Sequence, residues 1–293
     1  MNIPIMEEIL SVLNNRERAA LVWIAFGLVL ALRSKGIRSS LVLVAKILLS
    51  RPIFTVIAAM VGYVSLVVFG FRRLGLWDFG MVKDTTIWFL GSAFAMVFNH
   101  EQAHKDASYF KRTLLASLNV LVLVEFLINF YVLNIFIELL VVVPVLFFGA
   151  ALLAFSKTRE EYAPARRLME PVMAIVGFSL LAYAVARLMG DVTSFVAVEN
   201  VKRIVLPIAL TVLFLPFLYA LAVYSAYDGI SIRVKIWITD SELARYTRRE
   251  VFNACLFRLS RVNRFMKDYA ARLPTIKSKS DATKLIADFR ASH

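Results

Sequence analysis

Residues 114–155 read LLASLNVLVLVEFLINFYVLNIFIELLVVVPVLFFGAALLAF, and the only charged side chains among them are Glu125 and Glu138. An α-helix rises about 1.5 Å per residue, so about 20 apolar residues cross the hydrocarbon core of a bilayer. The stretch is too long for one crossing. Its best break is near Asn134, where a tight turn predicts two transmembrane helices, at 114–133 and 135–155.

The rest of the chain has the same character. Sixty per cent of the 293 residues are hydrophobic and the mean hydropathy is +0.71, whereas an ordinary soluble domain is about 45–50% apolar. Together with the two helices above, the sequence predicts an all-α integral membrane protein with about six or seven transmembrane helices. The further candidate spans are residues 53–71, 85–98, 171–189 and 204–227, with 19–32 as a short span or an interfacial helix and 41–49 as an interfacial segment.

Three regions follow from this pattern. Residues 1–52 form an N-terminal segment with one short span or interfacial helix, 53–227 a transmembrane bundle, and 228–293 a basic amphipathic helical tail. The net charge is +13, and the tail holds fourteen of the 34 Lys and Arg residues. Loops flanking alternate spans are basic on the side of the tail, so the positive-inside rule predicts a cytoplasmic C-terminus. We expect a multi-pass protein of the bacterial inner membrane.

Within the tail, residues 230–238 alternate between apolar and other side chains, which is compatible with a short strand or an extended connector. Asp240 or Ser241 can then begin a long helix that Pro274 ends, and Ser280 or Asp281 can begin a final short one. The apolar face of the long helix is expected to pack on a neighbouring subunit or on the membrane surface. Its basic side is a candidate site for an anionic ligand or lipid, formed by Arg258, Arg261, Arg264 and Lys267.

Four polar residues fall inside or at the ends of predicted spans. Glu125 is near the middle of its span, and Asn129 lies four residues on, hence on the same helix face. A charge at that depth costs about 2.5–3.5 kcal/mol on insertion scales, so it needs water or a partner. The pair either lines a pore or holds an ion, or it joins helices by hydrogen bonds. Glu138 and Arg187 are predicted on the outer side, where they can form a structural ion pair.

His100-Glu101-Gln102-Ala103-His104 matches the H-E-x-x-H motif. On a helix, the two histidines share a face and can ligate zinc while the glutamate activates a bound water. The motif lacks a third recognisable ligand, and Lys105 and Asp106 follow it directly. We therefore expect no catalytic residue, metal or cofactor. The alternative is a zinc site in which His100 and His104 are ligands and Glu101 is the catalytic residue.

Other chemistries lack a motif in the sequence. The only cysteine is Cys255, so no disulfide forms within the chain. Phosphate-cradling, dinucleotide and nucleophile-elbow motifs do not occur. Duplex DNA binding is not expected, and the lipid bilayer is the first partner that the composition implies.

Three segments resemble an uncharacterised bacterial family of multi-pass membrane proteins, namely residues 85–99 (TTIWFLGSAFAMVFN), 121–140 (LVLVEFLINFYVLNIFIELL) and 204–233 (IVLPIALTVLFLPFLYALAVYSAYDGISIR). We associate this family with membrane effectors of anti-phage defence, including the channel component of the Hailong system. The resemblance implies a homo-oligomeric ion channel, held shut by an anionic nucleotide or oligonucleotide on the cytoplasmic side. It also implies that Glu125 and Asn129 recur, whereas the H-E-x-x-H motif does not. Only residues 1–52 precede the first long span, which departs from the N-terminal plug expected there.

Three functions remain open at this stage. The first is a regulated oligomeric ion channel or pore-forming effector, for which the resemblance implies a role in antiviral defence, with Glu125 and Asn129 in its path. The second is a membrane-embedded zinc metalloprotease. The third is a secondary transporter with Glu125 as an ion site, although the sequence has no detectable inverted repeat.

Overall fold

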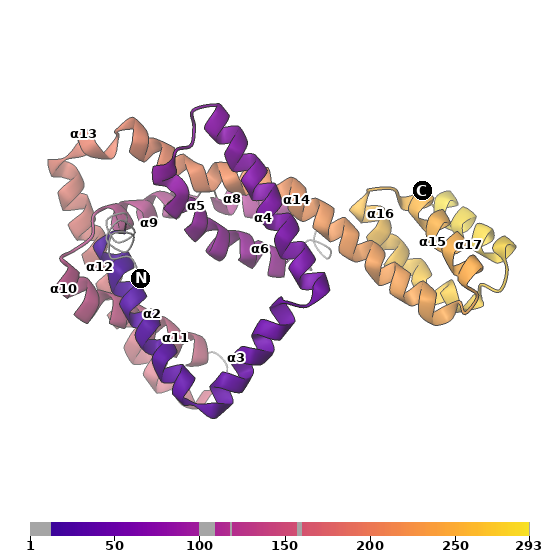
Figure 1. Cartoon of the computed structure of the whole chain (residues 1–293), viewed down its shortest axis with the longest axis horizontal. Helices are drawn as coiled ribbons and strands as arrows, with labels where there is room; N and C mark the ends of the chain where they lie inside the picture. Colours follow the sequence, from indigo (N-terminus) through magenta and orange to yellow (C-terminus); the bar gives the residue numbers. More distant parts are fainter. Residues whose placement is uncertain (1–12, 100–108, 118, 157–159, 293) are drawn as a thin grey trace, which may run out of the picture. The chain divides into compact units, whose positions relative to one another are not determined.

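The computed structural model describes residues 13–99, 109–117, 119–156 and 160–292, and in these ranges every regular element is a helix. The prediction of an all-α protein is thus confirmed. In chain order the elements (Figure 1) are α2 (Asn15–Arg33), α3 (Lys35–Leu48), α4 (Arg51–Arg73), η1 (Phe79–Met81), α5 (Val82–Trp88), η2 (Phe89–Ala93), α6 (Phe94–Phe98), α8 (Tyr109–Ser117), α9 (Val120–Phe130), α10 (Ile135–Ile137), η3 (Glu138–Val142), α11 (Val143–Ser156), η4 (Glu160–Tyr162), α12 (Ala163–Gly190), α13 (Val192–Phe195), α14 (Val198–Trp237), α15 (Ser241–Cys255), α16 (Leu259–Arg264), η5 (Phe265–Tyr269), η6 (Ala270–Thr275) and α17 (Lys279–Ala291).

Five helical stretches within the described residues are long and apolar enough to cross a membrane. They are Arg51–Arg73, Phe79–Phe98, Ile135–Ser156, Ala163–Gly190 and Val198–Trp237. The number rises to six if α2 and α3, which meet at a bend of 109° (Figure 1), form one broken span. Short π-helical turns at η2 and η3 interrupt two of these stretches without ending them.

The predicted span at 114–133 is wrong as a single helix. α8 ends at Ser117, and α9 begins afresh at Val120 with Asn119 as its N-cap, whose side chain accepts a hydrogen bond from the Leu121 N–H at 3.2 Å. Asparagine is among the strongest N-cap residues and interrupts helices for this reason. The 11 residues of α9 extend only about 16 Å, roughly half of the hydrocarbon core. The predicted break near Asn134 is confirmed, because Asn134 caps α10.

The helices fall into two compact units, which divide the chain differently from the three predicted regions. One unit consists of residues 1–84 and 118–206, and the other of residues 85–117 and 207–293. In the first unit much of the apolar surface is uncovered. Only 11% of the most apolar window is buried in α4 and likewise in α12. Large exposed apolar surfaces mark contacts with lipid or with another subunit.

The second unit has a hydrophobic core of its own. The helices α15, α16 and α17 gather at the end of α14 (Figure 1), and their apolar faces pack on it and on one another. The fully buried large side chains of this core include Ile230, Val234, Val251, Phe265, Leu273 and Phe289. The apolar face predicted to meet a neighbouring subunit or the membrane surface is therefore covered largely within the chain.

Residues 230–238 are not a strand or an extended connector. α14 continues to Trp237, and the buried side chains of Ile230 and Val234 within it, and of Ile238 directly after it, recur every four residues. Ile232 and Ile236 are exposed on the opposite side. Apolar residues alternate along this stretch, but only every fourth residue is buried, and this spacing is that of a helix.

The predicted long helix ending at Pro274 is broken as well. Asp240 caps α15 as expected, but the helix ends at Cys255, followed by Leu256 with a positive φ of 51°. The chain then restarts as α16, η5 and η6, and Pro274 lies in the last of these. α17 begins one residue earlier than predicted, with Ser278 as N-cap and Asp281 completing the capping box. The hydrogen bonds from Ser278 hold the pKa of the Asp281 carboxyl below its ordinary value.

The sole cysteine lies in the core of the second unit. Cys255 is fully buried, and burial raises the pKa of its thiol to about 11, against the opposing effect of Arg261. We predict that the thiol resists a water-soluble thiol reagent at pH 8 in the folded protein and reacts stoichiometrically after denaturation. Because the unfolded chain loses this proton at a lower pH, stability should fall as the pH rises from about 9 to about 11. Rapid labelling of the native protein at pH 8 would contradict this placement.

Candidate functional site

Several polar side chains of the first unit meet at the junction between α9 and α10, where residues 131–134 are not helical. The last carbonyl groups of a helix have no partner within it. In an apolar surrounding, each unpartnered backbone group costs several kcal/mol. The junction therefore needs hydrogen-bond donors from elsewhere in the chain.

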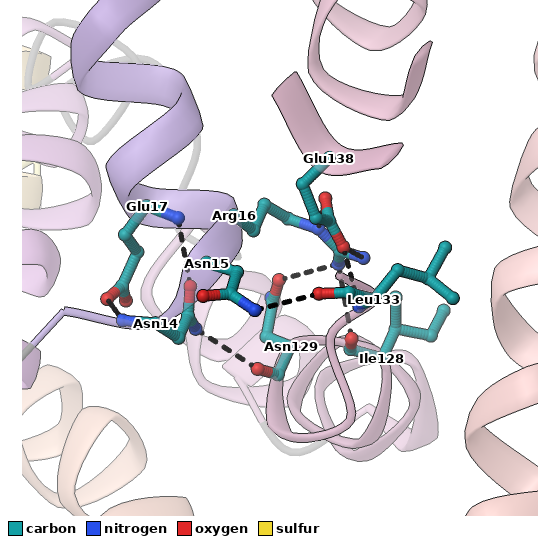
Figure 2. Close-up of polar contacts among 8 residues, drawn as sticks. All are labelled: Asn14, Asn15, Arg16, Glu17, Ile128, Asn129, Leu133 and Glu138. Carbon is teal, nitrogen blue, oxygen red and sulfur yellow. Dashed lines mark hydrogen bonds and ion pairs between the residues drawn. The ribbon is translucent and has the colours of Figure 1, made fainter. Parts of the chain in front are cut away.

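The first residues of α2 supply these donors, as Figure 2 shows. The Arg16 Nη1 donates to the Ile128 carbonyl at 3.1 Å, and the Asn14 Nδ2 donates to the Asn129 carbonyl at 3.2 Å. The Asn15 Nδ2 donates to the Leu133 carbonyl at 3.0 Å. Three consecutive side chains thus bind three carbonyls exposed by the break. A positive charge at the C-terminal end of α9 also suits the helix dipole.

Arg16 also forms a two-pronged ion pair with Glu138 (Figure 2). Its Nη2 lies 2.9 Å from Oε1 and its Nε lies 3.0 Å from Oε2. Glu138 is fully buried, and the Arg16 side chain is 13% exposed. The Glu138 carboxylate accepts a third hydrogen bond, from the Leu133 N–H to Oε1 at 3.0 Å. This carboxylate is desolvated but well satisfied, which is the condition for a buried charge to be tolerated.

A second contact ties α2 to the start of the following span. The Trp23 Nε1 donates to the Leu139 carbonyl at 2.7 Å, and its ring packs edge-on against Phe148. Leu139 lies in the π-helical turn η3. Turns of this kind disturb the regular backbone ladder and often lie at functional positions.

The network extends from α2 to α5 through Glu17. This residue is the N3 partner of Asn14 in a capping box, and its Oε2 also lies 3.1 Å from the Lys83 Nζ. We call Asn14, Asn15, Arg16, Asn129 and Glu138 the junction cluster. It holds the start of α2, the end of α9 and the start of α10 together.

Of the predicted pore residues, Asn129 belongs to this cluster and Glu125 does not. The Asn129 Oδ1 accepts a hydrogen bond from the Arg16 Nη1 at 3.1 Å. Glu125 is exposed on the surface of α9, and among the described residues no hydrogen bond or ion pair is found for its carboxylate. Asn129 is thus hydrogen-bonded within the chain, whereas the Glu125 side chain is exposed.

The predicted ion pair between Glu138 and Arg187 is not the one that forms. Arg16 takes the place of Arg187, which is exposed near the end of α12. Arg16 is nearer because the junction draws the start of α2 against α10.

The four residues of the predicted basic set in the tail differ in exposure and in their contacts. Arg258 and Lys267 are exposed, and the Arg264 Nη2 binds the Ser292 carbonyl at 2.8 Å. Arg261 is partly buried and its Nη1 is 3.5 Å from the Ala254 carbonyl. As a site for an anionic ligand or lipid, this set remains a prediction.

The H-E-x-x-H motif, with His100, Glu101 and His104, lies outside the described residues. Among the residues that are described, no group of three or more His, Cys, Asp or Glu side chains could hold a metal ion. The alternative zinc site therefore stays untested.

Two groups of residues were missed from the sequence alone. Arg16 belongs to the string Asn14-Asn15-Arg16-Glu17, whose capping-box spacing was a usable signal for the start of α2. Arg245, Arg248 and Arg249 share a face of α15 by their spacing of three and four residues. Both signals were available but did not by themselves indicate a partner.

Comparison of the chain with protein-family models, with curated proteins and with solved structures gives no match. The function is therefore argued from the residues and their geometry.

Proposed function

We propose that this protein is a membrane-inserted homo-oligomeric ion channel, with one Glu125 from each subunit facing an aqueous path along the symmetry axis. The membrane part of the proposal is supported by the five or six long apolar helices and by their poorly covered apolar faces. The cytoplasmic C-terminus is supported by the charge pattern of the loops, and the bacterial inner membrane by the family resemblance. A role in anti-phage defence, and control by an anionic nucleotide, rest on the family resemblance alone.

The observation that carries the proposal is the exposed stripe on α9. Leu121, Glu125 and Asn129 are spaced by four residues, and each is exposed in the single chain. A carboxylate on the lipid-facing side of an apolar helix is strongly unfavourable. Since the first unit does not bury Glu125, water or a second subunit has to solvate it. A ring of carboxylates around a water-filled axis meets both conditions, and rings of this kind select cations.

The interruption before α9 fits the same function. The basic loops at 105–112 and 157–167 are both predicted on the cytoplasmic side, so the chain has to cross the membrane twice between them, first between residues 113 and 134. α9 alone is too short to do so, and we propose that this crossing is interrupted before α9 begins. Irregular backbone at membrane depth is tolerated where it is buried in protein or lines an aqueous cavity. Discontinuous helices commonly form ion sites.

The junction cluster then has a positioning role. It fixes the C-terminal end of α9 to α2 and α10 through partly buried hydrogen bonds. Among the described residues of the first unit, no other helix packs on the exposed face of α9. The contacts at its C-terminal end therefore have to hold the helix in place. In this account Arg16 and Glu138 support α9, and Glu125 meets the ions.

Cysteine accessibility tests the proposal. In a Cys255→Ala background, Glu125→Cys should react with a charged, membrane-impermeant thiol reagent and form disulfide-linked dimers under oxidation. Leu123→Cys is the matched control, since Leu123 is exposed on a different face of α9 and should meet lipid. Equal labelling at both positions, or a Glu125→Cys protein that never cross-links, would contradict the ring.

A further inference from the structure

A cavity of about 760 Å³ lies between α14 and α15 in the second unit. The α14 wall is aromatic and apolar, with Tyr219, Tyr224 and Tyr227 among its residues. The α15 wall carries Arg245, Arg248 and Arg249. We call this the arginine pocket. Its two walls differ in chemistry, as expected for a ligand with a charged end and an apolar body.

The three arginines are available to a ligand. They occupy positions i, i+3 and i+4 of α15 and so present their side chains on one face. Among the described residues, no carboxylate lies within ion-pair distance of any of the three. Only the Arg248 Nε is engaged, by a long hydrogen bond of 3.3 Å to the Ala244 carbonyl. Guanidinium groups in such a cluster are suited to phosphate.

The arginine pocket lies at the level where the apolar part of α14 ends. No charged residue occurs between Arg203 and Asp228, and the pocket is lined by residues from Tyr219 through Tyr227 and on to Ser231. In a transmembrane helix the end of the apolar run marks the membrane interface, where tyrosine is enriched. The arginines of α15 therefore stand at the depth of lipid phosphates.

Hydrogen bonds hold one end of the pocket in shape. The Tyr219 hydroxyl donates to the Phe257 carbonyl at 2.8 Å, and the Tyr227 hydroxyl donates to the Leu256 carbonyl. These bonds fix the connector after α15, where Leu256 has its positive φ. The pocket is thus a built feature of the second unit rather than a chance gap between two helices.

We infer that the arginine pocket binds the phosphate headgroup of an anionic phospholipid, with the glycerol and upper acyl chains against the tyrosine wall. The inference rests on the membrane placement of α14 in the proposed function. Charge complementarity favours an anionic headgroup, and an apolar wall continuous with a span favours a lipid over a soluble phosphate compound.

Native mass spectrometry of the full chain in mixed micelles tests this, with phosphatidylglycerol and phosphatidylcholine as probes. Arg245→Gln/Arg249→Gln should weaken phosphatidylglycerol binding at least about tenfold and leave phosphatidylcholine unchanged. The charge-matched control is Lys277→Gln/Arg290→Gln, which removes two exposed basic residues outside the pocket and should change binding less than about threefold. Helix content by circular dichroism checks that both variants fold.

Three results would overturn the inference. The first is an equal loss of phosphatidylglycerol binding in both variants, which would indicate diffuse electrostatic attraction. The second is unchanged phosphatidylglycerol binding in the pocket variant. The third is displacement of the lipid by low-millimolar inorganic phosphate. Lipid binding is measured without conductance, so a wild-type protein that binds phosphatidylglycerol in the pocket but conducts no ions would refute the channel and keep the lipid site.

Discussion

Replacing Arg16 with methionine is expected to lower the free energy of unfolding by about 3–5 kcal/mol, the usual cost of removing one partner from a buried ion pair. The substitution leaves the fully buried Glu138 carboxylate without its two guanidinium hydrogen bonds. It also removes the donor to the Ile128 carbonyl at the end of α9. The loss combines an unpaired charge with an unpartnered backbone group.

A second substitution separates these effects. In Arg16→Met/Glu138→Leu both charges are absent, so the double variant should recover part of the stability that the single variant loses. Arg187→Met is the matched control, because Arg187 was the alternative partner and is exposed. Its effect should stay within about 0.5 kcal/mol.

The measurement is equilibrium unfolding in micelles with increasing anionic denaturing detergent, followed by circular dichroism. A larger loss for Arg187→Met than for Arg16→Met would show that Glu138 pairs as the sequence first suggested. Equal and small losses for both would remove the junction cluster from the account.

Replacing Glu125 with glutamine is expected to reduce cation conductance at least about tenfold while the protein still inserts and assembles. A ring of carboxylates concentrates cations at the pore by a factor of about 10 or more, and glutamine keeps the size of the side chain while removing the charge. Glu125→Lys should go further and shift the selectivity towards anions. Neither change affects the hydrogen bonds of the junction cluster.

Planar-bilayer recording of purified protein measures both effects, with Glu199→Gln as the control. Glu199 is an exposed carboxylate in the first turn of α14, so its loss should leave conductance and selectivity near the wild-type values. Wild-type currents in Glu125→Gln would exclude this residue from the conducting path.

The sequence predicted most of the helices because long apolar runs and turn residues are local signals. The helices around residues 53–71, 135–155, 171–189 and 204–227 were found in this way. The break near Asn134 was also predicted, because the apolar run is too long for one crossing and needs a turn. Asn119 carries a helix-capping signal of its own, which the prediction of a single span at 114–133 leaves out.

Partners distant in the sequence were harder to predict. The sequence indicated that Glu138 needs a basic partner. Whether this partner is Arg16 or Arg187 depends on which helix end packs at the junction. That is decided by the carbonyls of α9, which Asn14 and Asn15 bind beside Arg16. Likewise, the arginines of α15 form one wall of a pocket only because α14 supplies the other wall, which the sequence alone does not show.

The exposed position of Glu125 was not predictable from its sequence either, because a charge in an apolar helix is normally assumed to point inward. Burial in a single chain depends on the neighbouring helices, and α9 leaves Leu121 and Glu125 exposed while Asn129 contacts the first unit through Arg16. This outward direction is what changes the expectation from a site within one subunit to a site shared between subunits.

The central claim is that Glu125 from several subunits surrounds one aqueous axis. Single-particle imaging of the detergent-purified protein tests it most directly. The account predicts a symmetric ring in which each α9 turns Glu125 towards the central axis. A monomer with Glu125 enclosed in a sealed cavity, or a ring with Glu125 on its outer surface, would contradict it.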